Sequence, residues 1–290
     1  MNEFKGSVLV TGVSSGIGKS TAELLCKSGY FVIGSVRNKD DATELQSTFA
    51  KSFIPIVFDV TNENDVFSCV ENLRTRTNIP LIGIVNNAGI AIGGPILHLD
   101  VAAFRKQFEV NVFGLLSVTK ACMPWLLQSR SSGKRTRIIN ISSVSGKRTY
   151  PFMGPYSASK HAVEAISDAL RKELLLYDIG VIVIEPGPIN TPIWDKAPDP
   201  EKNIFIGTPY EESLRRFNKL IVEKGKEGLP PGDVAKIVLK SLEAKRSKTR
   251  YVITPNRFSS FTLPGILPEK WVDRLTAKLL NLHPNRNEEE

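Results

Sequence analysis

Short apolar segments alternate with amphipathic segments along most of this chain of 290 residues. The apolar segments are too short for helices, and their consecutive apolar residues are typical of strands buried on both faces of a parallel sheet. The expected strands lie at 7–11, 31–36, 54–58, 81–86, 137–141, 181–185 and 251–254. Strict alternation of strand and helix predicts the α/β class, with a doubly wound parallel sheet of about seven strands and right-handed crossovers.

Helices are expected between these strands, at 17–28, 39–51, 62–77, 100–128, 155–178 and 231–244. Two segments interrupt the alternation. An insertion at about 188–230 follows the sixth strand and contains a further expected helix near 210–224, and an amphipathic tail follows Pro255. Since no change of composition marks a linker, we predict one domain at 1–255 with a lid at about 188–230, and a C-terminal extension at 256–290.

The composition excludes several classes of function. The net charge is +8 and the pI is near 9.3, but the basic residues are scattered, so no nucleic-acid partner is expected, whereas an anionic cofactor fits. Cys26, Cys69 and Cys122 lie far apart and only three histidines occur, so no metal site is expected. The odd number of cysteines fits reduced thiols in a cytoplasmic protein. No signal peptide is recognised, and no apolar stretch approaches the ~20 residues that cross a bilayer.

A glycine-rich turn lies between the first strand and the first helix. Glycines let a backbone approach a pyrophosphate closely, and the helix N-terminus supplies N–H donors and a positive dipole. The strand–turn–helix context therefore predicts a dinucleotide site, although three residues separate its first two glycines, unlike the commonest G-x-G-x-x-G pattern. The residues expected to contact the cofactor here are Gly12, Ser14, Ser15, Gly16, Ile17 and Gly18.

Tyr156 and Lys160 stand one helical turn apart, with Ser143 thirteen residues upstream of the tyrosine. Residues four apart on a helix share a face, so the ammonium group can approach the phenol and lower its pKa from about 10. Lowering it to about 7 requires about 4 kcal/mol, which one cation in a partly dry cleft can supply. Alone, the pair also fits a packed tyrosine followed by a solvated lysine.

Together with the glycine turn, these residues make the chain resemble the short-chain dehydrogenases/reductases. The matching motifs follow that family's order and spacing over roughly 5–255. They are 11–18, Asp59 with Val60, 86–89, Asn111, Ser143, Tyr156 with Lys160, and Pro186 with Gly187 and Thr191. The resemblance implies one Rossmann-like domain, hydride transfer with a nicotinamide cofactor, and a homodimer or homotetramer.

The resemblance and the residues together assign the catalytic groups. Tyr156 is expected to act as general acid or base, with Ser143 binding the substrate oxygen beside it. Lys160 is expected to lower the tyrosine pKa and to bind the nicotinamide ribose. The resemblance gives Asn111 a water that connects Lys160 to solvent. Adjacent residues at a strand end point in opposite directions, so only one of Ser142 and Ser143 can face the cleft, and the family spacing selects Ser143.

The resemblance also implies the remaining cofactor contacts. An acidic residue at the end of the third strand binds the adenine amino group in the family, and Val60 flanks it, which assigns Asp59 to the adenine. Asn87 begins the turn after the fourth strand and is expected to brace the central strands. The remaining expected contacts are Ala88 and Gly89 in that turn and Pro186, Gly187, Ile189 and Thr191 after the sixth strand, near the nicotinamide carboxamide.

The end of the second strand bears on the choice of cofactor. The acidic residue that would bind the 2′-hydroxyl of NAD is replaced by Val36. Arg37 follows directly, and its guanidinium suits a 2′-phosphate, to which Ser14 can add a hydroxyl donor. NADP(H) is therefore favoured, with NAD(H) as the alternative and a solvated strand-end charge as the ordinary explanation of Arg37.

Apolar residues dominate the expected substrate side and favour a hydrophobic alcohol or carbonyl compound. A looser resemblance to the steroid and retinol dehydrogenase branch suggests a steroid-, retinoid- or lipid-like molecule. Packing of the insertion onto the domain is the alternative role for about half of these residues. They are Ile90, Ile92, Gly93, Gly94, Tyr150, Pro151, Phe152, Met153, Ile193, Trp194, Ile204, Phe205, Ile206, Tyr210 and Phe217.

Two other functions fit the same residues: an NAD-dependent alcohol dehydrogenase, and a non-catalytic sensor that binds NADP. The intact set of Asn111, Ser143, Tyr156 and Lys160 disfavours the sensor, because a sensor needs no proton relay. The amphipathic tail is expected to dock on its own domain or on a partner subunit, with weak contact to an anionic membrane as the alternative.

Overall fold

The computed structural model describes residues 4–193 and 205–283, whose strands form one parallel sheet of seven strands in the order β3-β2-β1-β4-β5-β6-β7. All pairs of neighbouring strands are parallel. The strands are β1 (Ser7–Thr11), β2 (Phe31–Val36), β3 (Phe53–Val57), β4 (Leu81–Asn86), β5 (Arg137–Ile141), β6 (Gly180–Pro186) and β7 (Arg250–Ile253). The predicted doubly wound α/β fold is confirmed.

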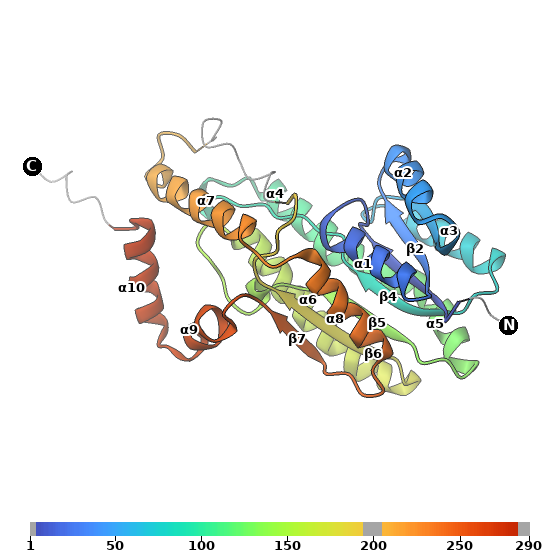
Figure 1. Cartoon of the computed structure of the whole chain (residues 1–290). Helices are drawn as coiled ribbons and strands as arrows, with labels where there is room; N and C mark the ends of the chain where they lie inside the picture. The colour runs from blue at the N-terminus through green and yellow to red at the C-terminus, as the bar shows by residue number, and fades with distance from the viewer. Residues whose placement is uncertain (1–3, 194–204, 284–290) are drawn as a thin grey trace, which may run out of the picture.

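Helices cover both faces of this sheet (Figure 1). Helices α1, α2 and α8 enclose one apolar core, and α3, α5 and part of α6 enclose the other. The α-helices are α1 (Gly16–Lys27), α2 (Lys39–Phe49), α3 (Glu63–Arg76), α4 (Val101–Phe108), α5 (Gly114–Ser131), α6 (Gly154–Glu173), α7 (Glu211–Lys226), α8 (Pro231–Glu243), α9 (Leu263–Ile266) and α10 (Glu269–Leu280).

Alternation along each strand sends side chains to the two cores in turn. Val8 and Val10 on β1 face the α1 and α8 side, while Leu9 between them faces the α3 and α5 side. All three are fully buried. Continuous apolar strands are therefore required by a sheet that is covered on both faces.

The expected long helix at 100–128 is interrupted, which the sequence prediction missed. A π-helical turn, Glu109–Phe113, separates α4 from α5. Such a turn contains one more residue than a regular α-helical turn, and Asn111 lies at its centre. The expected helix at 155–178 is α6 up to Glu173 and continues as the 3₁₀ turn Leu174–Tyr177.

The helical run Val101–Ser131 is long and apolar enough, by length and composition alone, to cross a membrane. Charged residues interrupt this run, so no continuous apolar stretch of that length is visible in the sequence. In the structure 61% of its most apolar window is buried against the rest of the molecule. This is typical of a core helix.

The strand order reverses between β1 and β4, and this reversal determines where a ligand site can form. Successive connections from β1 and β4 leave in opposite directions across the sheet. In open α/β sheets a ligand crevice is expected at the carboxyl ends of the strands beside such a reversal. The glycine turn follows β1 at this edge, and Asn87 follows β4. Two segments that are distant in the sequence therefore meet at the predicted cofactor site.

Beyond β7 the chain forms a π-helical turn, Phe258–Thr262, then α9 and α10. Helix α10 stands out from the body at one end of the molecule, close to α7 (Figure 1). Leu280 near its end is buried in a small cluster with Phe152, Phe205 and Leu214.

Candidate active site

The glycine turn has a backbone shape that glycine favours. Gly12 has φ of +70°, in the left-handed region that L side chains rarely adopt. A side chain at Gly18 would overlap the carbonyl oxygen of Gly12 and lie 2.6 Å from Nδ2 of Asn87. Helix α1 therefore begins in close contact with the turn and with the segment after β4. This close approach fits the backbone cradle that a pyrophosphate needs.

The neighbouring residues of the turn have different surroundings. Ser15 is the N-cap of α1, and no side-chain cap hydrogen bond is formed there. Ser14 and Ser15 are exposed, whereas Ile17 packs partly against the core. Gly16 lies under Thr191, because an added Cβ would be 3.1 Å from the threonine Cγ2. The loop after β6 thus reaches the glycine turn.

Asn87 ties the two central strands together. Its Nδ2 donates hydrogen bonds to the carbonyl oxygens of Thr11 and Gly12, at 2.8 and 3.2 Å. The hydroxyl of Thr11 accepts from the backbone N–H groups of Asn87 and Ala88, at 2.9 Å each. These bonds hold the carboxyl ends of β1 and β4 at a fixed separation, with Gly89 directly following.

The exit of β6 forms the other wall of the crevice. The N–H of Gly187 donates to the carbonyl oxygen of Ile253 at 2.8 Å, so the segment after Pro186 stays attached to β7. Ile189 is buried and forms a parallel bridge with Leu229. The chain then brings Thr191 to the glycine turn.

The residues expected at the adenosine end lie at the carboxyl ends of β2 and β3. Arg37 follows β2 and is exposed. Asp59 lies two residues beyond the end of β3 and is also exposed, and its Oδ1 accepts hydrogen bonds from the N–H and hydroxyl of Thr61, at 2.9 and 2.8 Å. Val60 is buried and touches Gly114 of α5.

Tyr156, Lys160 and Ser143 meet beside the same crevice. The Ser143 hydroxyl lies close enough to the Tyr156 hydroxyl to act on its pKa as a hydrogen-bond donor. Lys160 is buried, its Nζ donates to the carbonyl oxygen of Ile141 at 2.8 Å, and it lies 5.8 Å from the centroid of the Tyr156 ring. Helix α6 places the two residues on one face, as their spacing predicts.

The direction of the tyrosine pKa differs from the prediction. Burial raises the pKa of Tyr156 above its usual value, and the hydrogen bond with Ser143 lowers it only in part. The Lys160 ammonium is bound to Ile141 and lies over the ring, so it does not offset the lost hydration of a phenolate. Burial also lowers the pKa of Lys160, to about 8, although the carboxylate of Glu164 acts in the opposite direction.

Ser142 and Ser143 diverge at the end of β5. Ser143 caps the following 3₁₀ turn, accepting from the N–H of Ser145 at 3.1 Å, and its hydroxyl is 3.4 Å from the carbonyl oxygen of Pro186. The hydroxyl of Ser142 is buried, has no hydrogen-bond partner among the described residues, and would contact a Cβ on Gly146. The serine that joins Tyr156 is therefore Ser143.

Asn111 holds the loop after β4. Its Oδ1 accepts from the N–H of Ile90 at 2.9 Å, and its Nδ2 donates to Ile90 O and Ser159 Oγ, both at 3.1 Å. Ser159 in turn donates to the carbonyl oxygen of Tyr156 at 2.7 Å. Asn111 thus connects α6 to this loop, and its bonds do not include Lys160.

Sequence reasoning missed Gln107, a fully buried side chain on α4. It accepts from the N–H of Ile92 and donates to the carbonyl oxygen of Ile90, at 2.7 Å each. An amide four residues before Asn111, on an otherwise apolar helical face, is the signal that could have revealed it. Both amides bind the loop that follows β4.

The expected substrate side is only partly open. Phe152 lies edge-on to Tyr210 and Phe217, with ring centroids 6.1 and 5.6 Å away. These rings pack with the buried Phe205, so part of the predicted substrate-facing set forms a packed cluster instead. Tyr150, Ile193 and Ile206 are exposed. Trp194 and Ile204 lie outside the described residues.

Comparisons with known proteins agree on one family. Its profile, described as short chain dehydrogenase, matches residues 6–202. The NADPH-dependent 3-dehydrocapnine reductase of Ornithobacterium rhinotracheale is 40% identical over 272 residues, which cover 93% of this chain and 95% of that enzyme. The 3-ketodihydrosphingosine reductase of Bacteroides thetaiotaomicron is 32% identical over 252 residues, covering 86% and 87%.

Among solved structures, a short chain dehydrogenase/reductase from Burkholderia phymatum in complex with NAD matches with a TM-score of 0.77. The match covers 95% of this chain and 97% of that chain, at 23% sequence identity. At this identity it shows the fold alone.

The burial of Lys160 should make the free energy of unfolding depend on pH. The pKa of Lys160 is lower in the folded protein than in the unfolded chain. The contribution of this residue to the free energy of unfolding is therefore fully favourable only above the unfolded pKa, and it is lost as pH falls through about 8. We expect Lys160→Met to raise the free energy of unfolding near neutral pH, by less than the ~3 kcal/mol that the pKa difference represents, since Ile141 loses its donor.

The advantage of the variant should shrink as pH rises from about 8 towards 10.5, because the wild-type lysine then becomes neutral in both states. Urea unfolding at several pH values measures this difference, with Lys172→Met, at an exposed site, as the control. A constant difference across the range would contradict the buried-charge explanation.

Proposed function

The chain belongs to the short-chain dehydrogenase family, and from this premise we propose that it is an NADP(H)-dependent oxidoreductase acting on a hydrophobic carbonyl or alcohol. The observation that carries the proposal is the meeting of Tyr156, Ser143 and the buried Lys160 beside a glycine cradle. Fold alone would not suffice, because one fold supports many functions.

The cofactor fits the crevice at the carboxyl ends of the strands. Gly18 lies so close to Gly12 that a side chain at Gly18 would clash with the carbonyl oxygen of Gly12. A pyrophosphate at the start of α1 would therefore face only the backbone of these two residues. The exposed Arg37 would bind a 2′-phosphate, and Thr191 and the backbone after Pro186 would hold the carboxamide end. When bound, the nicotinamide supplies or accepts the hydride.

The protein's own residues handle the proton and the substrate oxygen. In the reductive direction Ser143 and Tyr156 bind the carbonyl oxygen, and the tyrosine donates its proton. The raised pKa of Tyr156 keeps it protonated, which suits a general acid. In oxidation the phenolate would be the base, and a lysine cation near the phenol oxygen would stabilise it.

Two observations support the substrate class that we propose. The two relatives are named for reduction of a 3-dehydro and a 3-keto compound, which favours a 3-oxo group as the reacting carbonyl. The exposed side chains of Tyr150, Ile193 and Ile206 give the neighbouring surface an apolar character. We therefore propose reduction of a lipid-like 3-oxo compound, in place of a steroid or retinoid.

The outer face of α10 supports weak membrane contact. Trp271, Leu275 and Leu279 follow one another at intervals of four residues and are 60%, 63% and 55% exposed. With 3.6 residues per turn, a residue one position earlier lies about 100° around the helix. Lys270, Arg274 and Lys278 precede the three apolar residues and form a basic row beside them.

An anionic bilayer surface matches this pairing of an apolar row with a basic row. The acidic residues of the helix, Glu269 and Asp273, lie on the opposite side from the apolar row. We propose this membrane contact together with a cytoplasmic location and a homodimer or homotetramer.

The first prediction concerns the acid. Tyr156→Phe should abolish turnover, because phenylalanine carries no proton to transfer, and should leave NADPH affinity nearly unchanged. Oxidation of NADPH across a panel of 3-oxo compounds, and quenching of protein fluorescence by NADPH, measure the two effects. Appreciable turnover by the variant would remove the tyrosine from the mechanism, while no turnover by either protein would favour a sensor.

A second prediction concerns cofactor choice. Arg37→Ala should lower kcat/KM for NADPH by about 10- to 100-fold, equivalent to 1–3 kcal/mol for a lost charge-assisted contact, and change kcat/KM for NADH little. The matched control is Lys39→Ala, which removes an exposed cation two residues away at the start of α2. An unchanged NADPH preference in Arg37→Ala would favour the NAD-dependent alternative.

A third prediction concerns the tail. The full chain should float with vesicles that contain phosphatidylglycerol and much less with pure phosphatidylcholine. Replacing Trp271 and Leu275 with serine should abolish flotation without loss of the buried Leu280 contact. Equal behaviour of both proteins on both vesicles would dismiss membrane contact, and a change in oligomeric state instead would indicate a second copy on this face.

A further inference from the structure

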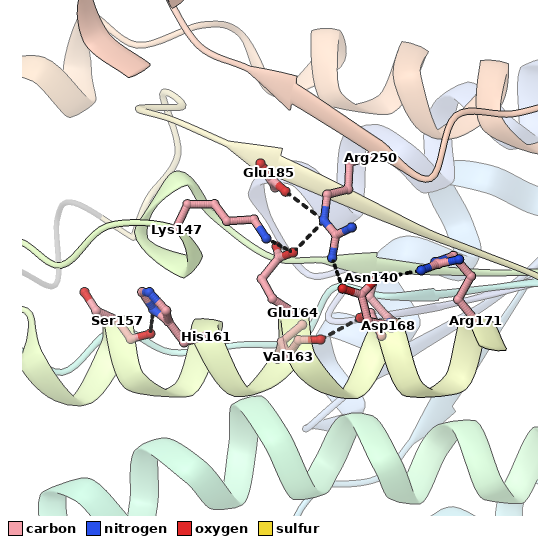
Figure 2. A network of polar contacts seen from close by, with 11 residues as sticks. Asn140, Lys147, Ser157, His161, Val163, Glu164, Asp168, Arg171, Glu185 and Arg250 are labelled. Carbon is pink, nitrogen blue, oxygen red and sulfur yellow. Dashed lines mark hydrogen bonds and ion pairs between the residues drawn. The ribbon is translucent and has the colours of Figure 1, made fainter. Parts of the chain in front are cut away.

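A network of charged side chains lies between α6 and the last two strands (Figure 2). Arg250 on β7 is at its centre. Its Nε donates to Glu164 Oε2 at 2.9 Å, and its Nη2 lies 2.8 Å from Asp168 Oδ2. Glu185 on β6 lies 3.4 Å from the same Nε, and Lys147 Nζ lies 2.9 Å from Glu164 Oε2. Three carboxylates from two elements thus share two cations.

This network directly adjoins the catalytic helix turn. Glu164 follows Lys160 by one turn on α6, so their side chains share a face. The short turn after β5 touches both, because a Cβ on Gly146 would lie 3.0 Å from Lys160 O and 3.1 Å from Glu164 Cγ. Glu164 is therefore the member of the network that lies nearest to Lys160 along α6.

One oxygen of Glu164 is not used by the network. Oε2 receives both Arg250 and Lys147, whereas Oε1 is buried and has no hydrogen-bond partner among the described residues. The side chain is 6% exposed. A buried carboxylate with one uncommitted oxygen exerts its field over several ångströms, because little water screens it.

The electrostatic effect on Lys160 has a defined sign. Burial lowers the pKa of this lysine to about 8, and the charge of Glu164 is the interaction that raises it. The same carboxylate contributes, after burial, to raising the pKa of Glu185 to about 7. The other titratable or charged groups around the pair are Tyr156 and Asp168 on α6, Lys147 after β5, Glu185 on β6, Arg250 on β7 and Arg257 beyond it.

We propose that Glu164 is a positioning residue for the hydride-transfer site, which keeps Lys160 in its cationic form while Arg250 and Lys147 fix the carboxylate in place. This inference rests on the proposed function, because it assigns Glu164 a task through Lys160. A cationic lysine is what the active site needs to bind a ribose hydroxyl and to favour the phenolate in the oxidative direction.

Asp168 is a matched control within the same network. It binds the same guanidinium at a similar distance and lies one turn further along α6. At a rise of about 1.5 Å per residue, its backbone is about 12 Å along the helix from Lys160, twice the separation of Glu164. If both carboxylates had a purely structural role, their removal should change the Lys160 titration midpoint by similar amounts. The proposed role predicts that only removal of the Glu164 charge changes this midpoint.

The direct test is the titration of Lys160 in the full-length protein, followed by NMR of ¹³C-labelled lysine ε-carbons and assigned by its loss in Lys160→Met. We expect Glu164→Gln to lower the midpoint by about one pH unit relative to the wild type. Asp168→Asn should leave the midpoint unchanged while lowering the melting temperature. Glu164→Asp, which keeps the charge, should restore most of the wild-type midpoint.

An unchanged midpoint in Glu164→Gln, or equal shifts in Glu164→Gln and Asp168→Asn, would overturn the proposal. If Glu164→Gln does not fold, Lys147→Met tests the pairing from the other side. Its removal leaves the Glu164 charge less compensated, so the Lys160 midpoint should rise, and an unchanged midpoint would again overturn the proposal. These readouts need no substrate, so they remain decisive even where turnover of 3-oxo compounds is not found.

Discussion

The burial of one primary amine, the side chain of Lys160, is the main constraint on this structure. Lys160 lies at 6% exposure with one backbone carbonyl as its direct hydrogen-bond acceptor. A buried ammonium is expensive to desolvate, so its surroundings have to compensate for the missing hydration. Ile141 at the end of β5 and Glu164 on the same helix face supply this compensation, and both depend on how α6 lies against the sheet.

The placement of α6 is set by polar contacts as well as by apolar packing. Asn140 on β5 is fully buried, accepts from Asn86 on β4 at 2.8 Å and donates to Ser167 on α6 at 2.9 Å. At the outer side Arg250 binds the helix to β7. Buried polar groups left unpaired are costly, so these contacts permit few alternative positions of the helix. Because Tyr156 and Lys160 lie on α6, the same contacts also fix their positions.

The features that the sequence predicted are those that depend on local pattern. Apolar runs such as Leu81–Asn86 and the spacing of Tyr156 and Lys160 each require only a period or a motif. The pKa of Tyr156 could not be predicted in the same way, because its direction depends on burial and on the hydrogen bond that Lys160 gives to Ile141. Gln107 and Arg250 became meaningful only when the fold brought Ile90 and Glu164 to them.

The π-helical turn Glu109–Phe113 has a consequence for comparison with relatives. It absorbs one extra residue inside a helix whose two ends are fixed, α4 by the loop after β4 and α5 by the core. A homologue with one residue fewer at this point could keep both ends in place as a continuous α-helix. The residue aligned with Asn111 would then turn by about 100° away from Ile90 and Ser159. A single alignment gap here would therefore mark a change in how the loop is held, even where the asparagine itself is retained.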